Sequence, residues 1–340
     1  MSFVSGSSAR FWPRVKEHAG NFPDMTKISA FKKMRFWSFV LLGTLAVGLV
    51  GVNEARAAPT FQAAGTAVNG TGAVTPAWPT HAVDDIALLI VESTGAEAVT
   101  LSTTAGFVAV TNSPQISGTG ATDTQLTVFW ARATSTTMAS PTVADPGDHV
   151  HAKIITYRSA INTGNPWNIT GGGVKSGTLT TSVTVTGVTT TVDDTLVVQI
   201  ATRSNDANGA GFSAQTNAGL TSLAERADDG SNSGNGGGFA VCDGIKATAG
   251  ATGSTTATVT SSLNAFLTIA LKPAVTTTLG NVTDPSSVTI APGAAATAAD
   301  AFTFQTSSGT DTITDVTVGL ATGAAVGLGL VEITNDAGTT

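Results

Sequence analysis

Residues 125–133 read QLTVFWARA, and this stretch decides the fold class. Leu126, Val128 and Trp130 alternate with Gln125, Thr127 and Phe129. The same alternation recurs at Val183 and Val185. A period of two with β-branched and aromatic residues is typical of a strand with one buried face.

Two further runs are apolar at nearly every position: IALLIV at residues 86–91 and FLTIAL at residues 266–271. Taken alone, such runs fit either a buried helix or a central strand covered on both faces. No sustained helical period occurs between Thr60 and Pro273, where Gly, Asn, Pro and Asp cut the chain into short segments. We therefore expect an all-β, antiparallel sandwich.

Composition excludes several functions. The chain has 340 residues, which suggests about two domains, and only 11% are charged. Residues 1–57 hold 8 of the 16 basic residues and 3 of the 23 acidic ones, so the remainder has a net charge of −12. This acidic balance disfavours nucleic-acid binding. A single cysteine, Cys242, excludes an intrachain disulfide and a cysteine-based zinc cluster.

The N-terminal 57 residues are predicted to be an extension and a secretory signal peptide. The apolar run Phe36–Val52, expected to be helical, follows three basic residues and precedes Ala55-Arg56-Ala57. These are the three parts of a signal peptide, with cleavage expected between Ala57 and Ala58. An uncleaved anchor is the alternative, although 17 residues are at the short limit for a membrane span. We expect a secreted or cell-surface protein whose only membrane contact is this segment.

Two similar segments stand 109 residues apart. Val83-Asp84-Asp85 and Val192-Asp193-Asp194 each lead into an apolar strand. The simpler interpretation is that Asp-Asp forms a turn at the strand entry. A catalytic carboxylate pair is the alternative.

Residues 58–273 resemble a jelly-roll sandwich domain found in phage structural proteins and bacterial surface proteins. The resemblance rests on both V-D-D strands (83–91 and 192–200), LTVFWARA (126–133), DPGDHV (145–150) and AFLTIALKP (265–273). It implies a jelly-roll fold and an extracellular or particle-surface setting, with no catalytic residues to transfer. A prophage-derived virion protein is a further interpretation, which the signal peptide disfavours.

A threonine-rich linker at residues 274–278 precedes a second predicted domain at 279–340. Its sequence resembles the opening strands of an immunoglobulin-like repeat of bacterial surface proteins. Its 62 residues fall short of the roughly 100 of a complete immunoglobulin-type sandwich. We therefore expect a partial repeat, completed by further sequence or by self-association through a neighbour's strand.

Two tryptophans are candidates for glycan binding, since an open ring face stacks on a sugar. Trp78 lies between Pro76 and Pro79, and Trp167 follows Asn165-Pro166, so both are expected in loops. Loops at the ends of a sandwich carry binding residues. The alternative is that each ring closes an end of the core.

The glycine-rich stretch 227–238 is a candidate calcium loop, the one cofactor we consider. Its oxygen-bearing side chains are Asp228, Asp229, Asn232 and Asn235. The spacing matches no established calcium motif, so a long surface loop is the alternative.

Other chemistry is weakly supported. His149 and His151 share one face of a strand without an evident third metal ligand, and Cys242 is expected to be a buried hydrophobe.

The interpretation is therefore a structural or adhesive surface protein, not an enzyme, with a glycan or another cell-surface partner. The alternative is a secreted polysaccharide-degrading enzyme with a carboxylate pair in a groove of the sandwich. The candidate carboxylates for that enzyme are Glu92, Asp123, Asp145 and Glu225.

Overall fold

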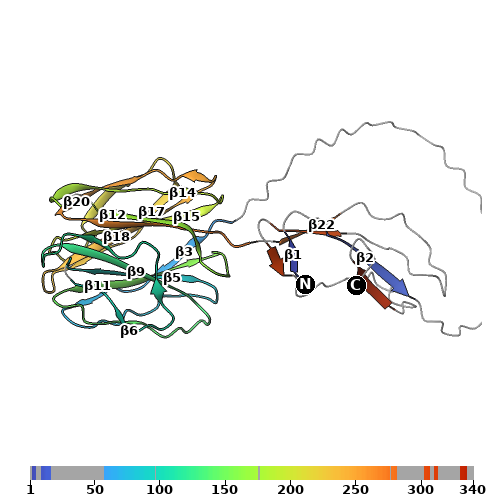
Figure 1. Cartoon of the computed structure of the whole chain (residues 1–340), viewed down its shortest axis with the longest axis horizontal. Helices are drawn as coiled ribbons and strands as arrows, with labels where there is room; N and C mark the ends of the chain where they lie inside the picture. Colours follow the sequence, from blue (N-terminus) through green and yellow to red (C-terminus); the bar gives the residue numbers. More distant parts are fainter. Residues whose placement is uncertain are drawn as a thin grey trace, which may run out of the picture. The chain divides into compact units, whose positions relative to one another are not determined.

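The computed structural model describes residues 57–95, 97–174 and 177–275, together with short strands at 2–4, 9–16, 277–281, 302–306, 310–312 and 330–334. The chain divides into two compact units. The larger unit is Ala55–Val275, and the smaller combines Met1–Glu54 with Thr276–Thr340. Every described element is a strand and every strand pairing is antiparallel, which confirms the all-β prediction (Figure 1).

The larger unit is built around two large sheets. The first follows the order β3-β11-β5-β9-β7, with β4 beside β11 and β8 beside β9. Its strands are β3 (Thr60–Ala64), β4 (Val68–Gly70), β5 (Ile86–Ser93), β7 (Val108–Ala109), β8 (Gln115–Ser117), β9 (Thr124–Arg132) and β11 (Val150–Arg158). The second follows β12-β21-β15-β18-β17. Its strands are β12 (Trp167–Val174), β15 (Thr195–Arg203), β17 (Thr221–Ser231), β18 (Gly237–Lys246) and β21 (Ala265–Leu271).

Smaller sheets cover the second large sheet and the outside of the first. A three-stranded sheet in the order β13-β20-β16 packs on the outer face of the second sheet. Its strands are β13 (Thr180–Val185), β16 (Phe212–Thr216) and β20 (Thr255–Ser262). Two-stranded pairs join β6 (Leu101–Thr103) to β10 (Thr142–Val143), and β14 (Thr189–Thr190) to β19 (Gly250–Ala251).

The main core lies between the two large sheets. Ile86, Leu88 and Ile90 of β5 face Val198 and Ile200 of β15 across it. The alternate residues of β5 contact a second apolar cluster on the outer face of the first sheet. The run 86–91 is therefore fully buried because both of its faces are covered, as predicted for a central strand. The run 266–271 in β21 is buried in the same way.

The two large sheets share one topology. If the five strands along each path are numbered in chain order, both sheets read 1-5-2-4-3. Each sheet is drawn from one half of the unit, so the chain passes between them once, after β11. The larger unit is therefore a sandwich of two halves with equivalent topology, and the jelly-roll arrangement in particular stays a prediction. Within the second half, the chain moves repeatedly between the large sheet and the sheet β13-β20-β16.

The smaller unit contains β1 (Ser2–Val4), β2 (Ala9–Lys16), β22 (Thr277–Asn281), β23 (Phe302–Thr306), β24 (Thr310–Thr312) and β25 (Leu330–Thr334). Strand β2 lies between β23 and β25 in the order β22-β23-β2-β25, and β1 pairs with β24. Strands of the predicted N-terminal extension thus pair with strands of the predicted partial repeat. The signal segment 36–52 lies outside the described residues.

Candidate functional site

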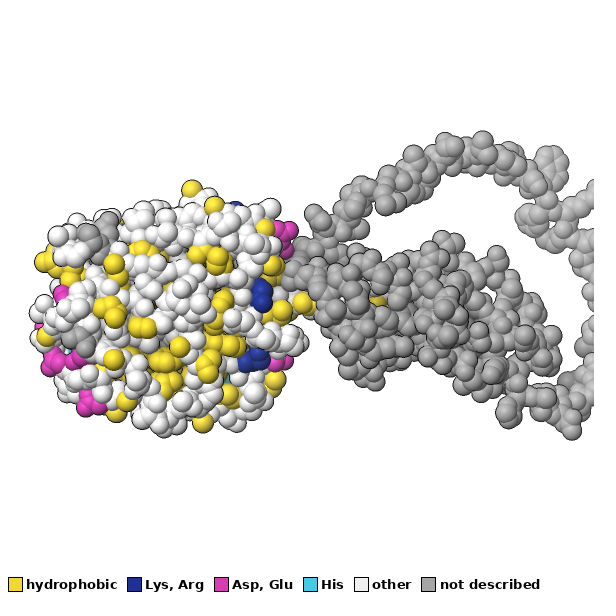
Figure 2. All heavy atoms as spheres, viewed as in Figure 1, with side chains coloured by type: hydrophobic (Ala, Val, Ile, Leu, Met, Phe, Trp, Pro, Cys, Tyr) yellow, Lys and Arg dark blue, Asp and Glu magenta, His cyan; other side chains and the backbone are white. Residues whose placement is uncertain are grey.

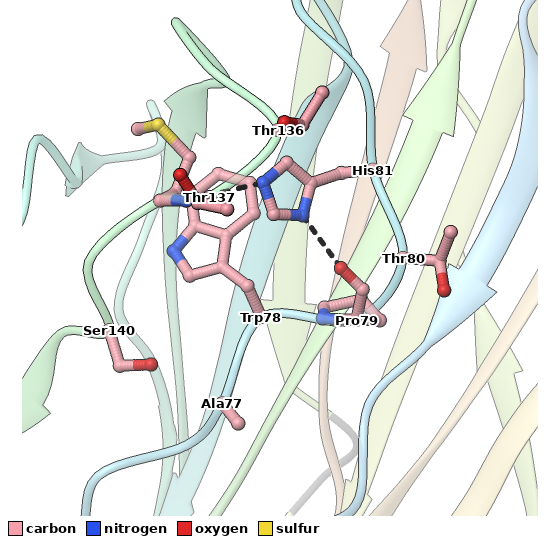
Figure 3. A pocket seen from close by; sticks show the side chains of 9 residues that line it. Ala77, Trp78, Pro79, Thr80, His81, Thr136, Thr137 and Ser140 are labelled. Atoms are coloured by element: carbon pink, nitrogen blue, oxygen red, sulfur yellow. Dashed lines mark hydrogen bonds between the residues drawn. The ribbon is translucent and has the colours of Figure 1, made fainter.

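An open pocket of about 480 Å³ lies between two loops that adjoin the first sheet. One loop connects β4 to β5 and carries Trp78 and His81; the other connects β9 to β10 and carries residues 134–141. Because Ile86, the first residue of β5, pairs with Arg132, the last residue of β9, both loops emerge at the same end of the sheet. Figure 3 shows the two loops facing each other across Trp78 and His81.

Trp78 is half-buried and held from several sides. Its indole Nε1 donates a hydrogen bond to the carbonyl oxygen of Ala139 in the opposite loop, at 3.0 Å. Its ring centroid lies 5.3 Å from that of buried Phe107 and 4.7 Å from that of His81. The ring therefore has a defined position at the pocket. The loop placement predicted for Trp78 is confirmed, since residues 75–79 form no strand.

His81 forms hydrogen bonds to both loops, and together these bonds require a single tautomer of its ring. Its Nδ1 lies 2.7 Å from the carbonyl oxygen of Pro79, which can only accept a hydrogen bond. Its Nε2 lies 3.4 Å from the backbone N–H of Met138, which can only donate. In this arrangement Nδ1 donates and Nε2 accepts a hydrogen bond. Both ring nitrogens are used structurally, so His81 contributes a ring surface rather than a catalytic base.

The rest of the lining combines hydroxyl-bearing side chains with the apolar side chains of Ala77, Pro79 and Met138. Hydroxyl-bearing side chains surround the two rings: Thr80, Thr136, Thr137 and Ser140. No Asp, Glu, Lys or Arg lines this pocket. Each hydroxyl can donate and accept hydrogen bonds. A rigid aromatic face beside neutral hydroxyls suits a neutral, polyhydroxylated ligand and offers no carboxylate for acid catalysis.

The structure corrects the placement of Trp167. This residue begins strand β12 and is 8% exposed. It belongs to the core between the large sheets, where its ring packs edge-on against Trp130 at 5.4 Å. Trp167 therefore has no open ring face for a sugar. The alternative interpretation, that the ring closes the core, holds for this residue.

The predicted calcium loop is a β-hairpin. Asp228 and Asp229 are within β17, and Asn232 and Asn235 are in the connection to β18. Consecutive strand residues point to opposite faces, so the two carboxylates cannot share one ion. Asp228 accepts hydrogen bonds from the backbone N–H groups of Gly211 and Phe212, whereas Asp229 pairs with Lys153. Within the described residues, no group of three or more His, Cys, Asp or Glu side chains could hold a metal ion.

The candidate catalytic carboxylates all have structural partners. Asp123 accepts a hydrogen bond from the Gly120 backbone at 2.6 Å, and Asp145 accepts one from Gly147 at 3.0 Å. Glu225 accepts one from Gln215. Glu92 is 1% exposed and bonded to His149.

The structure also describes three other residues that the sequence analysis named. Cys242 is buried, and burial raises the pKa of its thiol to about 12, so it is no nucleophile at neutral pH. At the predicted cleavage site, Ala57 and Ala58 precede β3 and form no strand.

The sequence singled out Trp78 but missed His81 and the loop 134–141. The signal was present as TSTTMAS, a hydroxyl-rich segment directly after a strand. It could not be linked to Trp78 because about 60 residues separate the two loops.

The part of the chain that the structure describes has no helix long and apolar enough to span a membrane. Comparison with known proteins identifies no matching family model, no matching curated protein and no matching solved structure.

Proposed function

We propose that this chain is a secreted or cell-surface structural protein whose larger unit binds a neutral glycan at the Trp78 pocket. The observation that carries the proposal is the pocket itself: a positioned indole ring, an imidazole ring and hydroxyl groups, with no Asp, Glu, Lys or Arg in the lining. Aromatic rings with a few well-placed polar groups are typical of small-ligand sites.

The scarcity of charged side chains on one face of the larger unit supports a structural role. Figure 2 shows that the visible face of the larger unit is mostly uncharged, with few basic or acidic side chains. The signal-like N-terminus and the net charge of −12 after residue 57 support export and disfavour nucleic acid as partner. Residues 279–340 would then form part of a stalk of immunoglobulin-like type.

Binding to an array of neutral and acidic glycans tests this function, with the native protein compared with Trp78→Ala. We expect neutral glycans to bind and Trp78→Ala to reduce affinity about tenfold or more, as for a central aromatic contact. Val174→Ala is the matched control, because Val174 is exposed on β12 of the second sheet. Binding that survives Trp78→Ala in a folded protein, or no binding to any neutral glycan, contradicts the proposal.

A further inference from the structure

A buried polar cluster lies at one end of the interface between the two large sheets. Glu92 of β5, His149 immediately before β11 and His151 of β11 are each 1% exposed or less. Burying ionisable groups is costly unless they are paired. The cluster lies on the inner faces of its strands, in line with the apolar core residues Ile90 and Ile155.

The second sheet shows that the fold does not need these groups. Tyr157 pairs with Ile86 in the first sheet as Leu271 pairs with Leu196 in the second, so β11 and β21 are equivalent strands. Counting back in steps of two from Tyr157 gives Ile155, Lys153, His151 and His149. The same steps from Leu271 give Ile269, Leu267, Ala265 and Leu263, all of which are buried. The same position in the sandwich is thus filled by apolar residues in one half and by ionisable residues in the other.

Glu92 and His149 share a proton. The Nδ1 atom of His149 lies 2.6 Å from the carbonyl oxygen of Ser233 and must donate to it. Its Nε2 lies 2.9 Å from Glu92 Oε2, and Glu92 Oε1 accepts a hydrogen bond from the Thr124 hydroxyl at 2.8 Å. The pair is satisfied when one proton lies between the imidazole and the carboxyl group.

These groups attach the tip of the β17–β18 hairpin to the first sheet. Besides the bond from His149 to Ser233, the hydroxyls of Ser231 and Ser233 donate to Asn69 Oδ1 at 2.9 and 3.2 Å. The backbone N–H of Asn235 donates to Asp148 Oδ2 at 2.8 Å. The hairpin belongs to the second sheet, so these bonds close the end of the interface.

His151 differs from its neighbours because neither ring nitrogen has a hydrogen-bond partner. Its ring packs on Phe239 of β18 at 5.1 Å. Burial lowers the pKa of His151 to about 4, which keeps the ring neutral at pH 7. The ionisable groups around it come from four strands and the segment before β11. They are Glu92 on β5, Lys153 on β11, Asp229 on β17, Arg203 on β15 and His149 immediately before β11.

We propose that this cluster is an acid-sensitive clasp that releases the β17–β18 hairpin from the first sheet when His151 takes up a proton. A protonated His151 would stand beside Lys153, Arg203 and the proton-sharing His149. Asp229, its one nearby carboxylate partner besides Glu92, is already paired with Lys153. A buried imidazolium without a hydrogen-bond partner is unstable until water reaches it, and water reaches it when the hairpin that carries Phe239 separates from the first sheet. This device is independent of glycan binding at the Trp78 pocket.

Backbone hydrogen exchange measured by mass spectrometry at pH 7 and pH 4 tests the clasp in the full chain, after correction for intrinsic exchange rates. We expect protection of peptides covering 228–240 to fall about tenfold or more at pH 4, while peptides from β21 remain protected. His151→Ala, which copies the counterpart Ala265, should abolish this loss. His81→Gln should leave it unchanged, because His81 lies in the outer pocket.

A second variant covers the case in which His151→Ala does not fold. It copies the second sheet at four positions: Glu92→Thr, because Thr202 is the counterpart of Glu92, together with His149→Leu, His151→Ala and Lys153→Leu. Equal hairpin protection at both pH values in the native protein overturns the proposal. The proposal is also overturned if hairpin protection still falls at pH 4 in whichever of these variants folds.

Discussion

Asp84 and Asp194 occupy corresponding positions in the two halves of the larger unit. Both have a left-handed backbone, with φ of 69° and 54°. Each donates its backbone N–H to the carbonyl oxygen of the residue after the neighbouring strand: Asp84 to Ala133 at 2.8 Å and Asp194 to Ala247 at 3.0 Å. Asp84 is the first aspartate of its V-D-D segment and Asp194 is the second, so the structural match is displaced by one residue from the sequence match. Both segments nevertheless form turns before the central strands β5 and β15, as the simpler interpretation predicted.

The turn geometry predicts the effect of substitution at Asp194. Asp tolerates a positive φ, Gly favours it, and a β-branched residue is strained there. Asp194→Val should therefore lower the free energy of unfolding by about 1–3 kcal/mol. Asp194→Gly should change it by about 0.5 kcal/mol or less. Urea unfolding of both variants checks this; equal losses would show that the side chain, not the backbone, matters.

The tryptophans should differ in their contributions to stability. Trp167→Ala removes a buried ring that packs on Trp130, so we expect a loss of about 3–5 kcal/mol in the free energy of unfolding. Trp78→Ala should cost clearly less, because that ring is half-buried. A loss below about 1 kcal/mol for Trp167→Ala would contradict its place in the core.

The shifted pKa of His151 predicts a pH dependence of global stability. The folded chain leaves His151 unprotonated down to about pH 4, whereas the unfolded chain protonates it near 6.5. Between these values the unfolded state binds more protons, so stability falls as the pH is lowered. The free energy of unfolding is then lower by about 3 kcal/mol at pH 4 than at pH 7. Urea unfolding from pH 7 to pH 4 should show this slope in the native protein and a smaller one in His151→Ala.

Asp228 should act as a structural acceptor rather than as a calcium ligand. Its carboxylate accepts hydrogen bonds from the backbone N–H groups of Gly211 and Phe212. Without Asp228, these two N–H groups would lose this acceptor. Asp228→Ala should therefore cost about 1–3 kcal/mol in the free energy of unfolding. Calcium should not raise the melting temperature of the native protein. A calcium-dependent rise that Asp228→Ala removes would restore the calcium interpretation.

The division into two units predicts the products of limited proteolysis. Cleavage close to Val275 and Thr276 should leave a resistant fragment of approximately Ala55–Val275. Mass spectrometry of the fragments identifies the boundaries. Early cleavage within β5 or β15 would show that the larger unit does not fold as one body.

The sequence alone determined the class of fold and the most deeply buried strands. Alternation in QLTVFWARA and the continuous apolar runs at 86–91 and 266–271 identify strands. The alternation predicted one buried face for residues 125–133, whereas β9 also buries Gln125, Thr127 and Ala131 on its other face. This information is local, because neighbouring strand residues point to opposite sides of the sheet. Trp78 was also found this way, since its flanking prolines mark a loop.

Tertiary structure decided everything that depends on which strands become neighbours. Trp167 is buried because Trp130 lies across the core from it. The pocket exists because two loops about 60 residues apart leave the same end of one sheet. His149 meets Glu92 across 57 residues, in a position where the equivalent strand of the second sheet carries Leu263. Such pairings follow from strand order and register, which bring together residues that no local pattern connects.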